Sequence, residues 1–177
     1  MEELYAGTRT IVYRGQRQVD QHRLLINLLR NEFPTFSELL QFQNQYAIAK
    51  NLNLSGIIQP YSLEPYGNGN GYIYIYVMED FGGVSLNQWK RRVGEWGRKS
   101  DFFSIALQLV DTLHQLHQQR VIHKDLKPAN ILIHPETQQV KLIDFSISSL
   151  LPRETQEIQN PTVLEGILKV TIWNKSY

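Results

Sequence analysis

The stretch His123-Lys124-Asp125-Leu126-Lys127-Pro128-Ala129-Asn130 is the most informative part of this sequence, together with Asp144-Phe145-Ser146 further on. It groups a histidine, a carboxylate, two lysines and an asparagine in a short loop that follows an apolar segment. A lone motif of this kind is equally compatible with an ordinary polar turn, so its surroundings determine how it is interpreted.

Two short apolar runs, Ile131–Ile133 and Val140–Ile143, follow the loop and flank a polar turn. They predict a hairpin that returns the chain to Asp144. With this hairpin, the segment strongly resembles the catalytic loop H-R-D-L-x-x-x-N and the metal-binding motif D-F-G of protein kinases. Lys124 stands in place of the arginine and Ser146 in place of the glycine.

The resemblance implies a role for each polar residue of the loop. Phosphoryl transfer depends mostly on positioning and charge neutralisation. Asp125 is the implied base for the substrate hydroxyl. Lys127 would neutralise the moving phosphoryl group, and a lysine there resembles serine/threonine kinases more than tyrosine kinases. Asn130 and Asp144 are the implied Mg²⁺ ligands, so the expected cofactors are ATP and Mg²⁺.

The resemblance also implies contacts between the nucleotide and residues outside this loop. Met78-Glu79-Asp80-Phe81 looks like the kinase hinge, in which backbone groups of Glu79 and Phe81 would meet adenine. Leu132 would form the adenine floor. The phosphate-covering loop of the family, G-x-G-x-x-G-x-V, aligns so that Gly7 is its one remaining glycine and Val12 its valine.

Two departures from the family concern the phosphates. In protein kinases a strand lysine holds the α- and β-phosphates, and a helix glutamate holds that lysine. The usual spacing puts Asn27 at the lysine position and Gln45 at the glutamate position. A neutral Asn27–Gln45 pair can hydrogen-bond but cannot neutralise phosphate, and a charge-assisted bond is roughly twice as strong as a neutral one. We therefore expect weak nucleotide binding.

Other residues leave the strength of binding open. Leu25 stands where the family usually has a small residue above adenine. Arg23 or Arg30 is an alternative source of the missing positive charge. The glycine-rich stretch Gly67-Asn68-Gly69-Asn70-Gly71 precedes a strand rather than a helix, so we interpret it as a turn and not as a phosphate loop.

The first half of the sequence predicts strands and one helix. Thr35 and Glu38 form a capping box, and the apolar periodicity extends the helix to about Leu52. Strands are expected over Thr10–Arg14, Leu24–Leu29 (buried on both faces), Ile57–Leu63 and Tyr72–Met78. The expected fold is α+β and two-lobed like a protein kinase, with an antiparallel-sheet N-lobe over residues 1–80 and a truncated helical C-lobe over residues 81–177.

The second half begins with two predicted helices, a short one capped by Ser85 and a longer one from Ser100 to Gln119. The longer helix has a broad apolar face that the family buries against later helices. Because those helices and the A-P-E motif are not found, we expect Phe103, Leu107, Val110 or Leu113 to be partly in water. The apolar tail Ile167–Trp173 is β-prone, and we expect self-association of the chain.

The end of the sequence favours a fragment or a frame-shifted gene product. Asn160–Gly166, N-P-x-V-L-E-G, and Phe81-Gly82-Gly83 resemble the N-terminal kinase domains of large bacterial multi-sensor signalling proteins. The main hypothesis is a degenerate, pseudokinase-like module with weak or no phosphotransfer. The alternatives are an active serine/threonine kinase in signal transduction that a partner completes, a small-molecule phosphotransferase, and a chain that does not fold alone.

The composition is ordinary for a globular protein. The chain has 177 residues and a formal net charge of +1, which gives no reason to expect nucleic acid or an anionic membrane as a partner. It has no cysteine, and its acidic N-terminus lacks the apolar run of a signal peptide. We expect a cytoplasmic protein that binds nucleotide weakly and has a protein partner or substrate.

Overall fold

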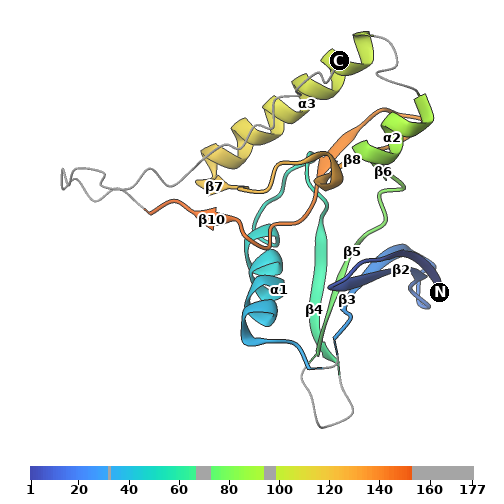
Figure 1. The fold of residues 1–177 in the computed structure, drawn as a ribbon, viewed down its shortest axis with the longest axis vertical. Coiled ribbons are helices and arrows are strands. Elements are labelled where there is room, and N and C mark those ends of the chain that lie inside the picture. Colours follow the sequence, from blue (N-terminus) through green and yellow to red (C-terminus); the bar gives the residue numbers. More distant parts are fainter. Residues whose placement is uncertain (32, 67–72, 94–98, 153–177) are drawn as a thin grey trace, which may run out of the picture.

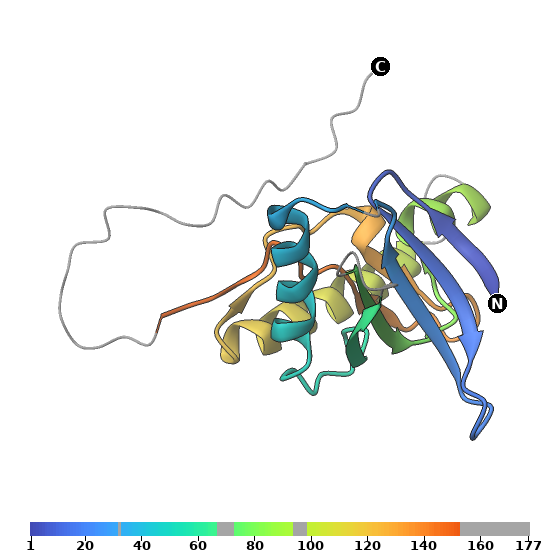
Figure 2. The same ribbon diagram turned by 90° about the horizontal axis from the view of Figure 1, so that it is seen from below.

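The computed structural model describes residues 1–31, 33–66, 73–93 and 99–152. The first part of the chain forms a five-stranded antiparallel sheet in the order β1-β2-β3-β5-β4, and helix α1 (Phe36–Ala49) covers one of its faces (Figures 1 and 2). The strands are β1 (Glu2–Ala6), β2 (Thr10–Gln16), β3 (Arg23–Leu29), β4 (Pro60–Tyr66) and β5 (Ile73–Glu79).

The second part lies at the other end of the long axis of the molecule (Figure 1). It contains helices α2 (Leu86–Val93) and α3 (Lys99–Gln118), the short 3-10 helix η1 (Pro128–Asn130), and two small antiparallel sheets. One small sheet is formed by β6 (Val84–Ser85), β8 (Ile131–Ile133) and β9 (Val140–Leu142), and the other by β7 (Val121–Ile122) and β10 (Ser149–Leu150). This architecture confirms the predicted α+β, two-lobe fold class.

Helix α1 begins with the predicted capping box. The Thr35 hydroxyl accepts the Glu38 amide at 3.3 Å, and the Glu38 carboxylate accepts the Thr35 amide at 2.8 Å. That bond lowers the pKa of Glu38. The helix ends at Ala49 and not at Leu52, because the chain beyond it turns to pack into the second part of the fold.

The segment after α1 pairs with β9 and does not yet belong to the large sheet. The Leu142 amide donates to the Gly56 carbonyl at 2.8 Å, and the Ile58 amide donates to the Leu142 carbonyl at 3.1 Å. Strand β4 therefore begins at Pro60, three positions later than the predicted Ile57. The division predicted at residue 80 is crossed here by backbone hydrogen bonds.

Two clusters of buried side chains form the core, and α1 contributes to both. One cluster lies between α1 and the large sheet and consists of Leu29, Phe42, Ile58, Tyr76 and Met78. The other lies in the second part and includes Ile48 and Ala49 of α1 together with Leu116, Ile133, Leu142 and Phe145. Helix α1 is thus fixed to both parts of the fold.

Two surfaces differ in how they are covered. Leu24 and Ile26 of β3 are only half-buried, because no helix in the described ranges covers the outer face of the sheet, so the expectation of a strand buried on both faces was wrong. On α3, Phe103, Leu107 and Val110 are 62%, 69% and 64% exposed, which confirms the predicted exposure, whereas Leu113 packs against the second core.

Other expectations concern single elements. Ser85 caps α2 as predicted, since its hydroxyl accepts the Gln88 amide at 3.3 Å. Helix α3 already includes Lys99, one position before its predicted cap. The predicted Gly67–Gly71 turn and the apolar tail lie outside the described residues. None of the helices within the described ranges is both long and apolar enough to cross a bilayer.

Candidate active site

The loop between β7 and β8 brings three of the predicted site residues together. The Asp125 Oδ2 atom accepts hydrogen bonds from Lys127 Nζ at 2.6 Å and from Asn130 Nδ2 at 2.9 Å. The Asn130 side chain also donates to the Asp125 carbonyl at 3.0 Å. Pro128 opens η1, and the helical turn carries Asn130 back towards Asp125. The result is a compact cluster with one carboxylate, one ammonium and one amide group.

The His123 side chain hydrogen-bonds to this loop and to the segment before Asp144. Its Nε2 atom lies 3.0 Å from the Ile143 carbonyl, and its Nδ1 atom accepts the Asp125 amide at 3.3 Å. This arrangement requires the neutral tautomer with the proton on Nε2. Burial lowers the pKa of His123, although the bond to the Ile143 carbonyl acts in the opposite direction. The ring packs edge-on against Phe145 at 4.9 Å between centroids.

Asp144 follows β9 and lies beside this loop. The Ile143 amide donates to the Asn130 carbonyl at 3.0 Å, which places Asp144 next to Asn130. Asp144 adopts a left-handed backbone with φ of 68°, a conformation that non-glycine residues adopt rarely and that often marks functional sites. Its carboxylate accepts the Ser146 amide at 3.2 Å. Ser146 itself has no positive φ, so serine fits where the family has glycine.

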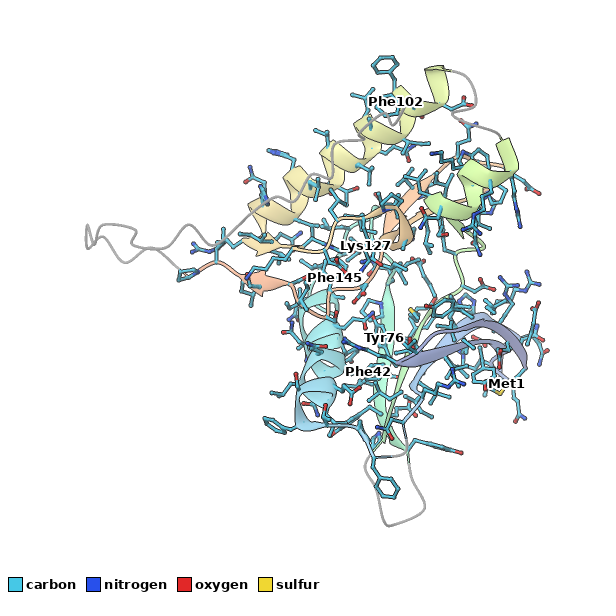
Figure 3. All side chains as sticks on the ribbon, in the orientation of Figure 1. Met1, Phe42, Tyr76, Phe102, Lys127 and Phe145 are labelled. Atoms are coloured by element: carbon cyan, nitrogen blue, oxygen red, sulfur yellow. The ribbon has the colours of Figure 1, made fainter. Side chains whose placement is uncertain are left out.

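Figure 3 shows Lys127 and Phe145 where the two parts of the fold meet, with Tyr76 and Phe42 below them near α1 and β5. Tyr76 is 2% exposed, and its ring packs edge-on against Phe42 and Tyr46 at 6.2 Å each. Burial, together with the neighbouring Tyr46 and Asp144, raises the pKa of the Tyr76 hydroxyl.

The side chains predicted to contact adenine lie in apolar surroundings. Leu25, Phe81 and Leu132 all pack against the buried cluster that contains Met78. The residues predicted above and below adenine, Leu25 and Leu132, therefore contact the same group of side chains. The Glu79 amide donates to the Gln59 carbonyl at 3.0 Å. The Phe81 amide makes no hydrogen bond within the described ranges, which leaves it available to a ligand.

Two ion pairs that the sequence did not reveal hold the connector after β5. Arg14 on β2 makes a two-pronged contact with Asp80, with Nε to Oδ2 at 2.7 Å and Nη2 to Oδ1 at 3.3 Å. Asp80 also accepts the amide of Gly82, whose φ of 72° suits glycine. The second pair joins Lys141 on β9 to Glu79. Both pairs are distant in sequence, so no local pattern identifies them.

Gly7 and Val12, which align with the phosphate-covering loop of the family, lie on the hairpin formed by β1 and β2. The Gly7 amide donates to the Thr10 carbonyl at 2.9 Å and closes the turn between β1 and β2. A side chain at Gly7 would overlap the Tyr5 ring, whose hydroxyl lies 2.6 Å from the position of a Cβ atom. Val12 pairs with Asn27 across the sheet.

Asn27 is the most unusual polar residue of the site. It is 8% exposed, and its Oδ1 atom is the one fully buried side-chain nitrogen or oxygen in the described ranges that lacks a hydrogen-bond partner. Gln45 therefore does not donate to it, so the expected Asn27–Gln45 hydrogen bond to this oxygen is absent. Asn27 is the direct partner of Tyr76 on β5, which places both side chains on the same face of the sheet.

Neither arginine occupies the position of the missing lysine. Arg23 pairs with Gln16 at the far end of β3, four positions and roughly 13 Å along the strand from Asn27. Arg30 follows β3, and its Nη1 atom donates to the Gly7 carbonyl at 3.0 Å. Strand alternation places Arg30 on the opposite face of the sheet from Asn27.

The donor set suits a magnesium ion. Both hydrogen bonds of the Asn130 amide nitrogen go to Asp125, which leaves the amide oxygen free to bind a cation. Asp144 offers a second oxygen ligand from the neighbouring segment. The Asp125 Oδ1 atom accepts no hydrogen bond within the described ranges, so it is available to take a proton. The cluster thus offers oxygen atoms of the kind that hard cations prefer and an unoccupied carboxylate oxygen, but Asn27 adds no positive charge to it.

Comparison with known proteins gives a consistent result. A family model described as protein kinase domain matches residues 1–166. The serine/threonine-protein kinase PrkC of Bacillus subtilis is 28% identical over 150 residues, which cover 84% of this chain and 22% of that protein. The serine/threonine-protein kinase PknA of Mycobacterium tuberculosis is 33% identical over 135 residues, which cover 71% of this chain and 29% of that protein.

The similarity extends to a eukaryotic protein. The dual specificity protein kinase TTK of Mus musculus is 35% identical over 88 residues, which cover 48% of this chain and 10% of that protein. The chain thus spans less than a third of the length of each of these three relatives.

Proposed function

This chain belongs to the protein kinase domain family, and on that premise we propose that it is a serine/threonine kinase-like domain that binds Mg²⁺–ATP weakly and transfers phosphate poorly or not at all. The curated relatives PrkC and PknA are serine/threonine kinases, which supports this class of nucleotide and acceptor. In this proposal the metal side of the site, with Asn130 and Asp144, matches the family, whereas the phosphate side, with Asn27, differs from it.

The metal side supports binding of a magnesium–nucleotide complex. Asn130 has a free amide oxygen and is held by two hydrogen bonds to Asp125, while Asp144 is held by the Ser146 amide. A bound Mg²⁺ would supply charge neutralisation for the phosphates. Asp125 would take the proton of an acceptor hydroxyl at its free Oδ1 atom, and Lys127 is close enough to Asp125 to offset the negative charge at that position.

Weak binding is expected because the phosphate side of the site has the neutral residue Asn27. The single observation is the buried Asn27 Oδ1 atom without a partner, at the position where the family has its phosphate-binding lysine. An amide can donate to a phosphate oxygen, but unlike a lysine it brings no positive charge. Most of the attraction for the triphosphate would then come from the metal ion.

Calorimetric titration of ATP into the purified chain tests the proposal. We expect weak binding in the presence of Mg²⁺, and loss of binding with EDTA or in the Asp144→Ala variant. The matched control is Asp111→Ala, which removes an exposed carboxylate from α3, and it should bind as the unmodified chain does. Tight binding without metal, or rapid phosphate transfer to an acceptor protein by the unmodified chain, would overturn the proposal.

We also propose that the domain associates with a second copy of itself through α3. Phe103, Leu107 and Val110 form an exposed apolar stripe at helical spacing, and the Phe103 ring packs edge-on against Phe102 at 5.6 Å between centroids. Figure 3 shows Phe102 on the outer side of α3, away from the rest of the fold. The net charge of +1 supports self-association as the explanation, since two copies would repel each other little.

A further inference from the structure

Asn44 on α1 holds the segment that follows Asp144. Its side-chain nitrogen lies 3.0 Å from the Ser146 carbonyl, 3.1 Å from the Ser148 carbonyl and 3.4 Å from the Phe145 carbonyl. An amide nitrogen has two hydrogen atoms to donate. The two short contacts account for both, and the third carbonyl lies just beyond them. One side chain of α1 thus binds the backbone of residues 145–148.

The same segment is held on its other side by the catalytic loop. The Ser148 hydroxyl donates to the His123 carbonyl at 2.9 Å, and this bond is buried. The Ser148 amide donates to the Phe145 carbonyl at 3.1 Å, which closes a turn over residues 145–148. The Phe145 ring packs against His123 and is 2% exposed. The only support of this turn from the α1 side, within the described hydrogen bonds, is Asn44.

Asp144 immediately precedes this turn and depends on it. Its carboxylate accepts the Ser146 amide, and its backbone has a positive φ that requires support from neighbouring groups. If Asn44 releases the Ser146 and Ser148 carbonyls, the turn loses its contact with α1, and the orientation of Asp144 is no longer fixed. The position of α1 is therefore coupled to the position of a predicted metal ligand.

We propose that Asn44 is a positioning residue that fixes the orientation of Asp144, the residue after the Ile143–Asn130 backbone hydrogen bond. Asn27 and Gln45 do not form a charged pair, and the Asn27 Oδ1 atom has no partner. Within the described hydrogen bonds, the contact between α1 and the segment after Asp144 is therefore made by Asn44. The part of this inference that concerns metal binding rests on the proposed function. The part that concerns the turn rests on the hydrogen bonds alone.

Amide hydrogen exchange without nucleotide tests the inference directly. In Asn44→Asp the side chain keeps its shape, loses both donors and places a negative charge beside carbonyl oxygens. We expect the Ser146 and Ser148 amides to exchange about tenfold faster, as the loss of one or two hydrogen bonds implies. Gln43→Asp is the control, since it adds the same charge one position away and Gln43 makes no side-chain hydrogen bond within the described part of the chain.

Three further results separate positioning from a general effect on stability. Amides of α3 should exchange at the same rate in Asn44→Asp as in the unmodified chain. Asn44→Gln, which retains two donors, should restore slow exchange at Ser146 and Ser148. Unchanged exchange at these two amides in Asn44→Asp, or an equal increase throughout the protein, would overturn the inference.

A second readout concerns the metal. Mn²⁺ binding in the presence of ATP, followed by electron paramagnetic resonance, should weaken about tenfold in Asn44→Asp and remain unchanged in Gln43→Asp. Equal Mn²⁺ affinity in the two variants would overturn the link to Asp144. If the unmodified chain binds no Mn²⁺ with ATP, the proposed function fails, while the exchange experiment still decides the role of Asn44 in the turn.

Discussion

Lys141 on β9 donates from its Nζ atom to the carboxylate of Glu79 at the end of β5. The Glu79 side chain also accepts the Gln59 amide at 3.0 Å, and the Lys141 ammonium lies 5.1 Å from the centre of the Phe81 ring. Lys141 is 7% exposed. This pair joins the two parts of the fold at the predicted hinge, so its energy contributes to holding the two parts together.

Removing one member of this pair should be more harmful than removing both. Lys141→Met leaves the Glu79 carboxylate with one partner in a mostly buried position, and we expect a loss of about 1–3 kcal/mol in the free energy of unfolding. Lys141→Met combined with Glu79→Gln should recover part of this loss, because no unpaired charge remains. Urea unfolding of both single variants and the double variant gives the coupling energy. Strictly additive losses would show that the two groups do not interact.

Acid should destabilise the domain through His123. Burial lowers the pKa of this residue in the folded state below its ordinary value of 6.5, so the unfolded chain binds a proton more readily than the folded chain. The contribution of neutral His123 to stability is complete above about pH 6.5 and is lost progressively as the pH falls towards the folded pKa. Urea midpoints measured from pH 7.5 to pH 5 should therefore decrease.

The variant His123→Phe separates this residue from other groups that titrate in acid. It retains a ring that can pack against Phe145 but cannot be protonated. We expect lower stability at neutral pH, because the Ile143 carbonyl and the Asp125 amide lose their partners. The decrease between pH 6.5 and pH 5 should also be smaller than in the unmodified chain, and an equal decrease would assign it to other residues.

Gly56 allows the close approach of the segment after α1 to helix α3. A Cβ atom at this position would lie 1.9 Å from Thr112 Oγ1 and 2.8 Å from Thr112 Cβ, and rotation of the threonine side chain cannot relieve the second contact. We expect Gly56→Ala to destabilise the domain by about 1–3 kcal/mol in urea unfolding, which is the usual effect of overpacking. Gly15→Ala is the control, since its Cβ would meet Leu24 at an ordinary 3.5 Å.

The exposed stripe on α3 should control self-association without contributing to stability. Leu107→Lys places a charge at a position that is 69% exposed, so the free energy of unfolding should change by no more than about 0.5 kcal/mol. Analytical ultracentrifugation should show fewer oligomers than for the unmodified chain. Leu113→Lys, on the buried side of the same helix, should instead destabilise the fold. A monomeric unmodified chain at high concentration would refute the proposed association.

How well the sequence predicted the structure depends on the distance between interacting residues along the chain. Asp125, Lys127 and Asn130 interact within one loop, and the resemblance of that loop to the kinase motif implied a shared site. The capping box at Thr35 is equally local. Asn44 and residues 145–148 are far apart in the sequence. No local sequence pattern indicates which distant residues an asparagine in a helix will contact. The same is true of Lys141 and Glu79.

The beginning of β4 could not be predicted because it depends on tertiary pairing. An apolar run over residues 57–63 predicts a strand by its composition, but Ile57 pairs with Leu142 in the other part of the fold, and β4 begins only at Pro60. Tertiary pairing thus determined an element boundary that composition could not. The unpartnered oxygen of Asn27 is also a property of the folded state, because Asn27 is buried in β3 between β2 and β5.

The central claim is that the site keeps the predicted metal ligands Asn130 and Asp144 but lacks the positive charge that binds the phosphates. The most direct measurement is the affinity for ATP, with Mg²⁺ present, of the double variant Asn27→Lys with Gln45→Glu. A restored lysine would form charge-assisted bonds to the phosphates, so we predict binding about tenfold tighter than that of the unmodified chain. Equal affinity in the two proteins would contradict the account, because it would show that the charge at position 27 does not limit nucleotide binding.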